Sequence, residues 1–370
     1  MLAPSPASAA YVARKAGTDL LYQVLLEQLE TFLARADAAE RPIPGHVERD
    51  LRAYLACGLP AFGFTWLVCP TCQDSVLVPF SCKGRGFCPS CGGRRMNQTA
   101  ANLVDRVLPH VPIRQWVLSF PMPLRLWLAR RPELRREVLA VVLRVVFGFY
   151  RRHARTAGHP DARFGAVCFH QHFGSSLNVN LHFHLLALDG WYSDSAEGPL
   201  FHEAPRLTDD DVARLVQRIR DRVLRLLGRR GLLGDETEDQ GDDGLFALQA
   251  ASAAGRAAMG LRAGRKTRRL RLLDPRTTDR VARLCADADW FSLHAGVRIR
   301  ADDRGGLERL CRYVCRPALS HDRLARRDDG LLQLRLKTPP ARRHHPPGPR
   351  RPRAGPEDRG AVSRRRGPTW

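Results

Sequence analysis

The most regular pattern of apolar and polar positions in the chain runs from Val179 to Leu185. Every second residue there is apolar, which predicts a half-buried β-strand with one face in a hydrophobic core. His182 and His184 occupy the opposite face, so their imidazoles would lie side by side. Two imidazoles in this arrangement can hold one divalent cation, with further ligands from a neighbouring element. Alternatively, the two histidines only line a solvated face of the sheet.

Similar periodicities predict the elements around this strand. Apolar stripes predict helices near residues 20–33, 46–56, 97–108, 132–155, 208–230 and 304–316, and alternation predicts strands near 75–80, 115–120, 163–173 and 291–299. Thr208 is the expected N-cap of its helix. From residue 115 onward the order strand, helix, strand, strand, helix, strand predicts an α+β protein with a ferredoxin-like split β-α-β sheet. We expect helices on one face of this sheet and a second face open for nucleic acid.

Cysteines are concentrated in one part of the chain. Six of the ten lie within residues 57–91, which in the absence of a secretion signal indicates metal ligation rather than disulfides. Two Cys-x-x-Cys turns around a hairpin-length segment are typical of a structural zinc ribbon, which we favour over a redox dithiol pair. The predicted Zn²⁺ ligands are Cys69, Cys72, Cys88 and Cys91. Cys57 and Cys82 either complete a second site or are simply buried.

The charge of the chain points to nucleic acid as a partner. The net charge is +22, the pI is near 10.7, and all but four of the 60 basic residues are Arg. Such a field attracts polyanions, although GC-rich coding also enriches Arg. Beside the zinc ribbon, the predicted DNA-binding residues are Lys83, Arg85, Arg94 and Arg95. No apolar run approaches the span of a bilayer and no signal peptide is evident, so we expect a cytoplasmic protein without a membrane partner.

Five segments together resemble transposases of the insertion sequence 91 family, which belong to the HUH (His-hydrophobic-His) class of single-strand DNA endonucleases. The segments occur in the order expected for the family and span roughly residues 46–337. They are Phe80–Arg95, Arg114–Ser119, Gln171–Asn178 leading into His182-Phe183-His184, Phe291–Ala295 and Leu307–Pro317. Each segment alone is weak, but the combination is highly specific.

The resemblance implies an enzyme that nicks and rejoins single-stranded DNA at element ends, through a 5′-phosphotyrosine intermediate, in rolling-circle-like transposition. It implies that His182 and His184 hold a catalytic Mg²⁺ or Mn²⁺ and that Tyr313 is the nucleophile. Gln171 is the preferred third metal ligand, and His294 is the alternative. The protein would be bacterial and associated with the nucleoid when bound to DNA.

Arg312 and Arg316 flank the tyrosine and would neutralise charge on the phosphate. Some family members carry a second tyrosine four residues away on the same helix. Here those positions hold Arg309 and Pro317, which indicates a single-tyrosine type. One tyrosine then serves successive cleavages, or a second subunit of a homodimer performs the second step.

The predicted domains are an N-terminal helical segment (1–45), a zinc-ribbon DNA-binding domain (46–108), an HUH catalytic domain (109–337) and a basic disordered tail (338–370). The tail departs from the family because it has too few apolar residues to fold. It is either a basic arm on DNA or the product of a frameshift, which we favour. Two other interpretations stay open: a non-catalytic zinc-ribbon nucleic-acid-binding protein or inactive remnant, and a phosphodiesterase that uses only the two histidines.

Overall fold

The computed structural model describes residues 19–84, 86–232, 244–259, 262–266 and 284–335. The chain divides into two units, Met1–Lys337 and Thr338–Trp370. The tail predicted for residues 338–370 lies outside the described residues, and so does the first part of the predicted N-terminal segment. Within the described part, no helix is long and apolar enough to cross a membrane.

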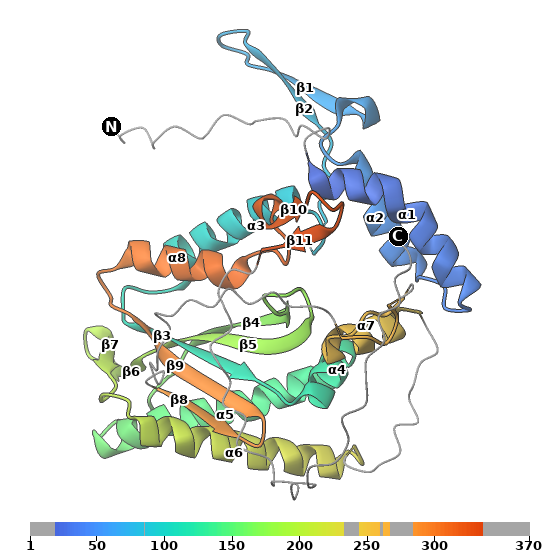
Figure 1. Cartoon of the computed structure of the whole chain (residues 1–370). Coiled ribbons are helices and arrows are strands. Elements are labelled where there is room, and N and C mark those ends of the chain that lie inside the picture. Colours follow the sequence, from blue (N-terminus) through green and yellow to red (C-terminus); the bar gives the residue numbers. More distant parts are fainter. Residues whose placement is uncertain (1–18, 85, 233–243, 260–261, 267–283, 336–370) are drawn as a thin grey trace, which may run out of the picture. The chain divides into compact units, whose positions relative to one another are not determined.

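A five-stranded antiparallel sheet organises the first unit, with the strand order β4-β5-β3-β9-β8 (Figure 1). The strands are β3 (Ile113–Ser119), β4 (Ala166–Phe173), β5 (Val179–Leu188), β8 (Cys285–Ala288) and β9 (Phe291–Ile299). The helix α5 (Pro132–Thr156) connects β3 to β4, and β5 pairs between these two strands. This is the predicted split β-α-β arrangement, so the predicted α+β class is confirmed. The short edge strand β8 was not predicted.

One face of the sheet is covered by α4 (Met122–Arg130), α5 and α6 (Asp209–Arg229) (Figure 1). The apolar side of β5 faces them, because Leu181, Phe183 and Leu185 belong to the same buried cluster as the apolar stripes of α5 and α6. Thr208 is the N-cap of α6, as predicted, and it forms a reciprocal capping box with Asp211. The largest core of the described structure therefore lies against the apolar face of β5. As a result, the face of β5 that carries the histidines points away from this core.

The second face is partly covered by α3 (Pro89–Asn102), the π-helical turn η3 (Leu103–Val107) and α8 (Arg304–Cys315). Leu186 and Leu188 of β5 pack there against the apolar stripe of α8. This corrects the expectation of an open second face, because a helix with a continuous apolar stripe needs a surface to bury it. Gly92 of α3 lies against Pro317, so closely that a Cβ at this glycine would be 2.8 Å from the proline Cβ.

The remaining elements are short hairpins and peripheral helices. They are α1 (Leu20–Ala38), α2 (Gly45–Ala56), η2 (Pro60–Phe62), β1 (Phe64–Val68), β2 (Ser75–Pro79), β6 (Gly190–Ser195), β7 (Gly198–Glu203), α7 (Gly244–Ala254), η4 (His321–Arg323), β10 (Leu324–Arg326) and β11 (Leu332–Leu334). The strand predicted near residues 75–80 is the second strand of the β1–β2 hairpin. The helix predicted near 97–108 begins earlier, because Pro89 is well suited to a first helical position.

Candidate metal and nucleophile sites

Four cysteines form a cluster where α2 and α3 meet. Their sulfur atoms all lie within 4.8 Å of one another, and the four residues are Cys57, Cys82, Cys88 and Cys91. Sγ–Sγ distances within the cluster are 3.6, 3.7 and 3.8 Å. Four sulfurs at about 2.3 Å from a tetrahedral zinc would be about 3.8 Å apart, whereas a disulfide bond is about 2 Å long. The cluster therefore fits a structural Zn²⁺ and does not fit disulfides.

This cluster corrects the predicted ligand set. Cys88 and Cys91 belong to the cluster, but its other two members are Cys57 and Cys82 instead of Cys69 and Cys72. For Cys57 and Cys82 the sequence had left open a second site or simple burial. The reason is the hairpin: strands β1 and β2 pair from Phe64↔Pro79 to Val68↔Ser75, and the Cys69–Cys72 turn follows at the far end. Five paired residues separate the two ends by about 13 Å. The first Cys-x-x-Cys turn is thus carried away from the second.

One thiol of the cluster, that of Cys57, has a lowered pKa. A hydrogen bond from the Cys88 thiol is the main reason that the pKa of Cys57 falls to about 5. Burial raises the pKa of Cys82 to about 11, and the pKa of Cys88 is also raised, mainly by the same hydrogen bond to Cys57. The thiolate is the form of cysteine that a metal cation binds, so the lowered pKa of Cys57 agrees with a metal site.

The predicted DNA-binding residues lie next to this cluster. Lys83 precedes α3 and is exposed, and Arg94 and Arg95 are exposed on α3 itself. Arg85 lies outside the described residues. Three of the four predicted cations therefore stand on the surface close in sequence to the zinc ligands, where phosphate could reach them.

The histidine pair lies on the second face of the sheet, as the alternation predicts. His182 and His184 are 9% and 2% exposed, and their ring centroids are 4.8 Å apart. The strand pairing places Gln171 of β4 opposite His182, and Val117 of β3 opposite His184. Because directly paired residues of a sheet project to the same face, Gln171 joins the histidines.

Hydrogen bonds fix how the two rings are presented. His182 donates from Nδ1 to the backbone carbonyl of Asn180, over 2.6 Å, which leaves Nε2 as a free acceptor. The side-chain amide nitrogen of Gln115 lies 2.8 Å from Nδ1 of His184, and as placed it donates to that ring nitrogen. Turning the amide over puts its oxygen at this position, and the ring then carries its proton on Nδ1 and presents Nε2 as a lone pair. Sequence reasoning missed Gln115, although a glutamine inside a buried strand is itself a signal.

Several polar atoms at the pair have no hydrogen-bond partner among the described residues. They are Nε2 of His184, both side-chain polar atoms of Gln171, and Oδ1 of Asn180. His294 of β9 is paired with Val117 of β3, so strand β3 separates it from His184 on β5. In the described structure, the cysteine cluster is the sole set of three or more His, Cys, Asp or Glu residues within ligand distance of one another. His294 is therefore not brought to the histidine pair, whereas Gln171 is beside it.

Both histidines are held in their neutral form. Burial lowers the pKa of His184 to about 3, with additional contributions from His182 and Arg316. The pKa of His182 is lowered chiefly by burial, and the charges of Arg125 and Arg316 act in the same direction. Neutral imidazole is the form that binds a cation. Arg125, at the start of α4, is a second residue that sequence reasoning missed.

Tyr313 lies beside the histidine pair. Its ring meets His184 edge to face, with centroids 5.8 Å apart, and 46% of the residue is exposed. The Arg316 guanidinium carbon lies 4.4 Å from the Tyr313 ring centroid. Arg312 instead pairs with Glu308 along the helix, N–O 2.7 Å. The fold thus brings together Tyr313, Arg316, His182, His184 and Gln171, which come from three separate segments.

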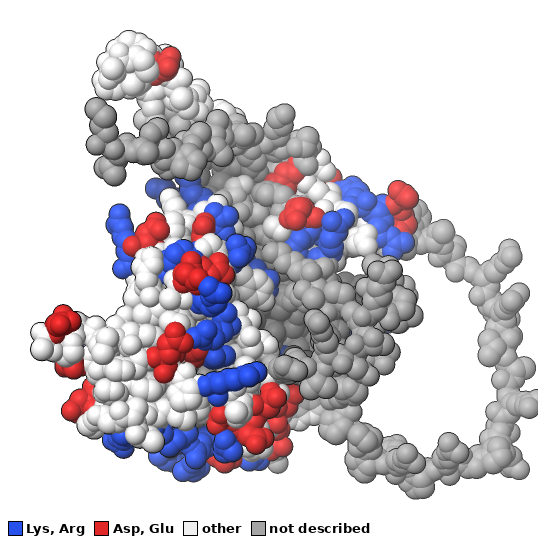
Figure 2. Space-filling view, turned by 90° about the vertical axis from the view of Figure 1, so that its left-hand side faces the viewer, with Lys and Arg blue, Asp and Glu red and all other residues white. Residues whose placement is uncertain are grey.

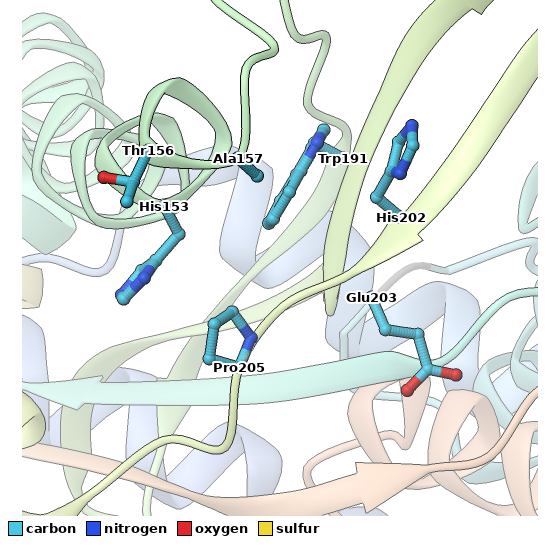
Figure 3. Close-up of a pocket in the computed structure, with 7 residues that line it drawn as sticks. All are labelled: His153, Thr156, Ala157, Trp191, His202, Glu203 and Pro205. Atoms are coloured by element: carbon cyan, nitrogen blue, oxygen red, sulfur yellow. The ribbon is translucent and has the colours of Figure 1, made fainter.

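A separate pocket of about 440 Å³ opens between the end of α5 and the β6–β7 hairpin (Figure 3). Trp191 and His202 lie face to face there, with centroids 5.9 Å apart. The other residues that line it are His153, Thr156, Ala157, Glu203 and Pro205. None of the predicted site residues lines this pocket, so it is not part of the histidine site.

Comparisons with known proteins yield two family matches. Residues 25–120 match the family model described as "Transposase zinc-binding domain", that of insertion sequence 91 elements. Residues 165–346 match the family model described as "Putative transposase". The first range includes the whole cysteine cluster, and the second includes the histidine pair and Tyr313. No curated protein and no solved structure matches the chain.

Proposed function

Because the chain belongs to the transposases of the insertion sequence 91 family, we propose that it acts on single-stranded DNA, which it nicks and rejoins through Tyr313. The protein is an enzyme of DNA transposition with a zinc-binding N-terminal region. The observation that carries the proposal is the contact between the half-exposed Tyr313 ring and His184. A nucleophile that DNA can reach is thereby held beside two neutral imidazoles.

For the catalytic cation we propose Mg²⁺ or Mn²⁺, held by His182, His184 and Gln171. The fit rests on the buried polar atoms of His184 and Gln171 that have no partner in the described structure. Leaving such atoms unpaired costs free energy, and ligation of a cation relieves that cost. Imidazole and amide ligands suit Mn²⁺ somewhat better than Mg²⁺. When bound, the cation would polarise the phosphate that is cleaved.

The proposed chemistry uses Tyr313 as the nucleophile. The phenol oxygen of Tyr313 attacks phosphorus and loses its proton, while the 3′-oxygen of the cleaved strand leaves and gains a proton. One phosphorus–oxygen bond forms as another breaks, so the linkage to tyrosine keeps the energy needed for rejoining. A second 3′-hydroxyl reverses the step and releases the tyrosine. This exchange needs no ATP.

In this proposal two arginines assist the exchange. Arg316 lies over the Tyr313 ring, and Arg125 is close enough to His182 to affect its pKa. Both would neutralise charge that develops on the phosphate. Arg312, which pairs with Glu308, would have to release that carboxylate before it could take part. We therefore assign the phosphate contact to Arg316 first.

An adduct assay tests the proposal. The full chain is incubated with Mn²⁺ and labelled single strands from the DNA flanking its gene, and the products are separated on a denaturing gel. The wild type and a matched control, Tyr192→Phe, should form a covalent protein–DNA band. Tyr313→Phe and His182→Ala should not.

An adduct that persists in Tyr313→Phe would show that another residue is the nucleophile. Cleavage without any adduct would favour a phosphodiesterase that uses only the histidines. If the wild type binds the strands but neither cuts nor links to them, the chain is a DNA-binding protein or an inactive remnant.

A further inference from the structure

The β1–β2 hairpin exposes apolar side chains on both of its faces. Trp66 is 69% exposed opposite Leu77 on one face, and Leu67 lies exposed opposite Val76 on the other. All five residues of β1 are exposed. A two-stranded hairpin is marginally stable in water on its own, and exposed apolar patches of this kind mark interfaces. The hairpin therefore needs a covering partner.

The same hairpin is almost free of charge. From Ala53 to Cys82 the sequence contains no Lys or Arg, and Asp74 is its single acidic residue, in a chain of net charge +22. In Figure 2 the hairpin at the top of the view is white apart from one red patch, whereas blue and red patches cover the surface below. A DNA-binding element needs cations for the phosphates. The partner of this surface is therefore protein rather than nucleic acid.

The turn of the hairpin carries a pair of thiols with no complete ligand set. The backbone N–H groups of Cys72 and Thr71 donate to the sulfur of Cys69, which lowers the pKa of Cys69. The Cys72 thiol lies 3.4 Å from a carboxylate oxygen of Asp74. Within the described residues, the one cluster of three or more metal-ligating side chains is elsewhere, at Cys57, so the pair at the turn supplies only two ligands.

We propose that Cys69 and Cys72 form half of a second zinc site, completed by the same two residues of a second copy of this chain, with the apolar strands of the two hairpins packed together. A twofold axis through the metal supplies four thiolates, which is a complete tetrahedral set. Four thiols lose four protons as the ion binds. An unrelated partner would need a matching thiol pair of its own, whereas a second copy brings one by symmetry.

Two measurements on the DNA-free full chain test this proposal. Sedimentation equilibrium gives the oligomeric state, and elemental analysis gives the zinc content. The wild type should be a dimer with about 1.5 zinc ions per chain, one in each cysteine cluster and one shared. Cys69→Ser/Cys72→Ser should contain about one zinc per chain and dimerise more weakly, by a factor on the order of 100.

A second variant separates the apolar surface from the thiols. Trp66→Arg/Leu67→Arg keeps both cysteines but places cations on the two faces of the hairpin, so it should likewise dimerise more weakly and contain about one zinc per chain as a monomer. The matched control, Cys168→Ser/Cys285→Ser, removes two thiols outside the hairpin and should leave both readouts unchanged.

Two outcomes would overturn the proposal. A wild-type monomer would exclude the shared site, and about two zinc ions per chain in that monomer would show that the turn binds zinc without a partner. A dimer of unchanged affinity in Cys69→Ser/Cys72→Ser would show that zinc does not join the copies. Because neither readout involves DNA cleavage, these results are independent of the role assigned to Tyr313.

Discussion

Gln115 controls the histidine site from a buried position on β3. Its amide contacts Nδ1 of His184, and 3% of the residue is exposed. Outer contacts of this kind orient a metal-binding imidazole and set which nitrogen carries the proton. In the proposed site the glutamine acts through His184, so it is a positioning residue.

Replacing this amide should weaken metal binding rather than abolish the chemistry. Gln115→Ala is expected to require about 10–100-fold more Mn²⁺ for half-maximal adduct formation, because the His184 ring loses its orientation. Gln115→Glu supplies an acceptor for a proton on Nδ1 and should lie closer to the wild type. The measurement is a Mn²⁺ titration of the adduct assay. An unchanged Mn²⁺ requirement in Gln115→Ala would mean that packing alone orients the ring.

The side chains of the site differ in how well the sequence predicts them. The alternation around His182 and His184 predicted both the strand and the face on which the histidines lie, because a period of two in apolar residues is typical of a half-buried strand. The partners of the imidazoles could not be predicted, since Gln115 lies 69 residues from His184. Strand pairing decides such contacts, and single-sequence periodicity carries no information on register. The position of Arg125 near His182 could not be predicted for the same reason.

Among the secondary-structure elements, β3, β5 and β9 are held together at one end by a buried carboxylate. Asp189, directly after β5, accepts hydrogen bonds from Arg114 on β3 through both of its oxygens, each at 2.8 Å. It also accepts from Arg298 on β9 at 2.7 Å and from the Tyr150 hydroxyl at 3.1 Å. Asp189 and Arg114 are only 4% and 6% exposed. Hydrogen bonds between charged side chains thus hold the strands together at the end of the sheet away from the histidines.

Removing this carboxylate should be strongly destabilising. Asp189→Ala leaves the Arg114 guanidinium buried without its partner, so we expect a loss of about 3–5 kcal/mol in the free energy of unfolding. Asp194→Asn is the matched control, because it breaks an exposed pair with Arg163 and should cost less than about 1 kcal/mol. Urea unfolding followed by circular dichroism measures both. Equal losses in the two variants would contradict the role given to Asp189.

Element positions were more predictable than element contacts. The N-cap at Thr208 and the strands β3, β5 and β9 follow from local patterns. The zinc-region hairpin was predicted between the two Cys-x-x-Cys turns, whereas β1 and β2 pair on either side of the first turn. The cysteine ligands did not follow from local patterns, because two Cys-x-x-Cys turns look equivalent in sequence. Only the length of the paired strands shows that one turn is carried beyond reach of the other. Sequence spacing therefore identified the metal but not its full ligand set.

For the whole molecule, the charge determines how DNA binding responds to salt. Each phosphate contact with a single strand contributes about −0.7 to the slope of log K against log salt. Replacing the two exposed arginines of α3, in Arg94→Gln/Arg95→Gln, should make this slope less steep by about 1.4. Fluorescence anisotropy of a labelled strand at several salt concentrations provides the slope.

The matched control for this experiment is Arg136→Gln/Arg163→Gln. It also removes two positive charges, but from arginines that pair with Glu133 and Asp194 on the surface. Its slope should stay close to that of the wild type. If both double variants change the slope equally, total charge rather than the face of α3 determines binding.

The packing of α3 against α8 bears on how this protein can evolve. One end of α3 carries two zinc ligands, α8 carries Tyr313, and Gly92 and Pro317 touch where the two segments meet. Leu103 and Leu108 share a buried cluster with Leu307 and Leu310. A recombination event that joined the first 108 residues to the remainder of a distant relative would mismatch this cluster. The zinc-binding part and the part that carries Tyr313 are therefore expected to be inherited together rather than shuffled as separate modules.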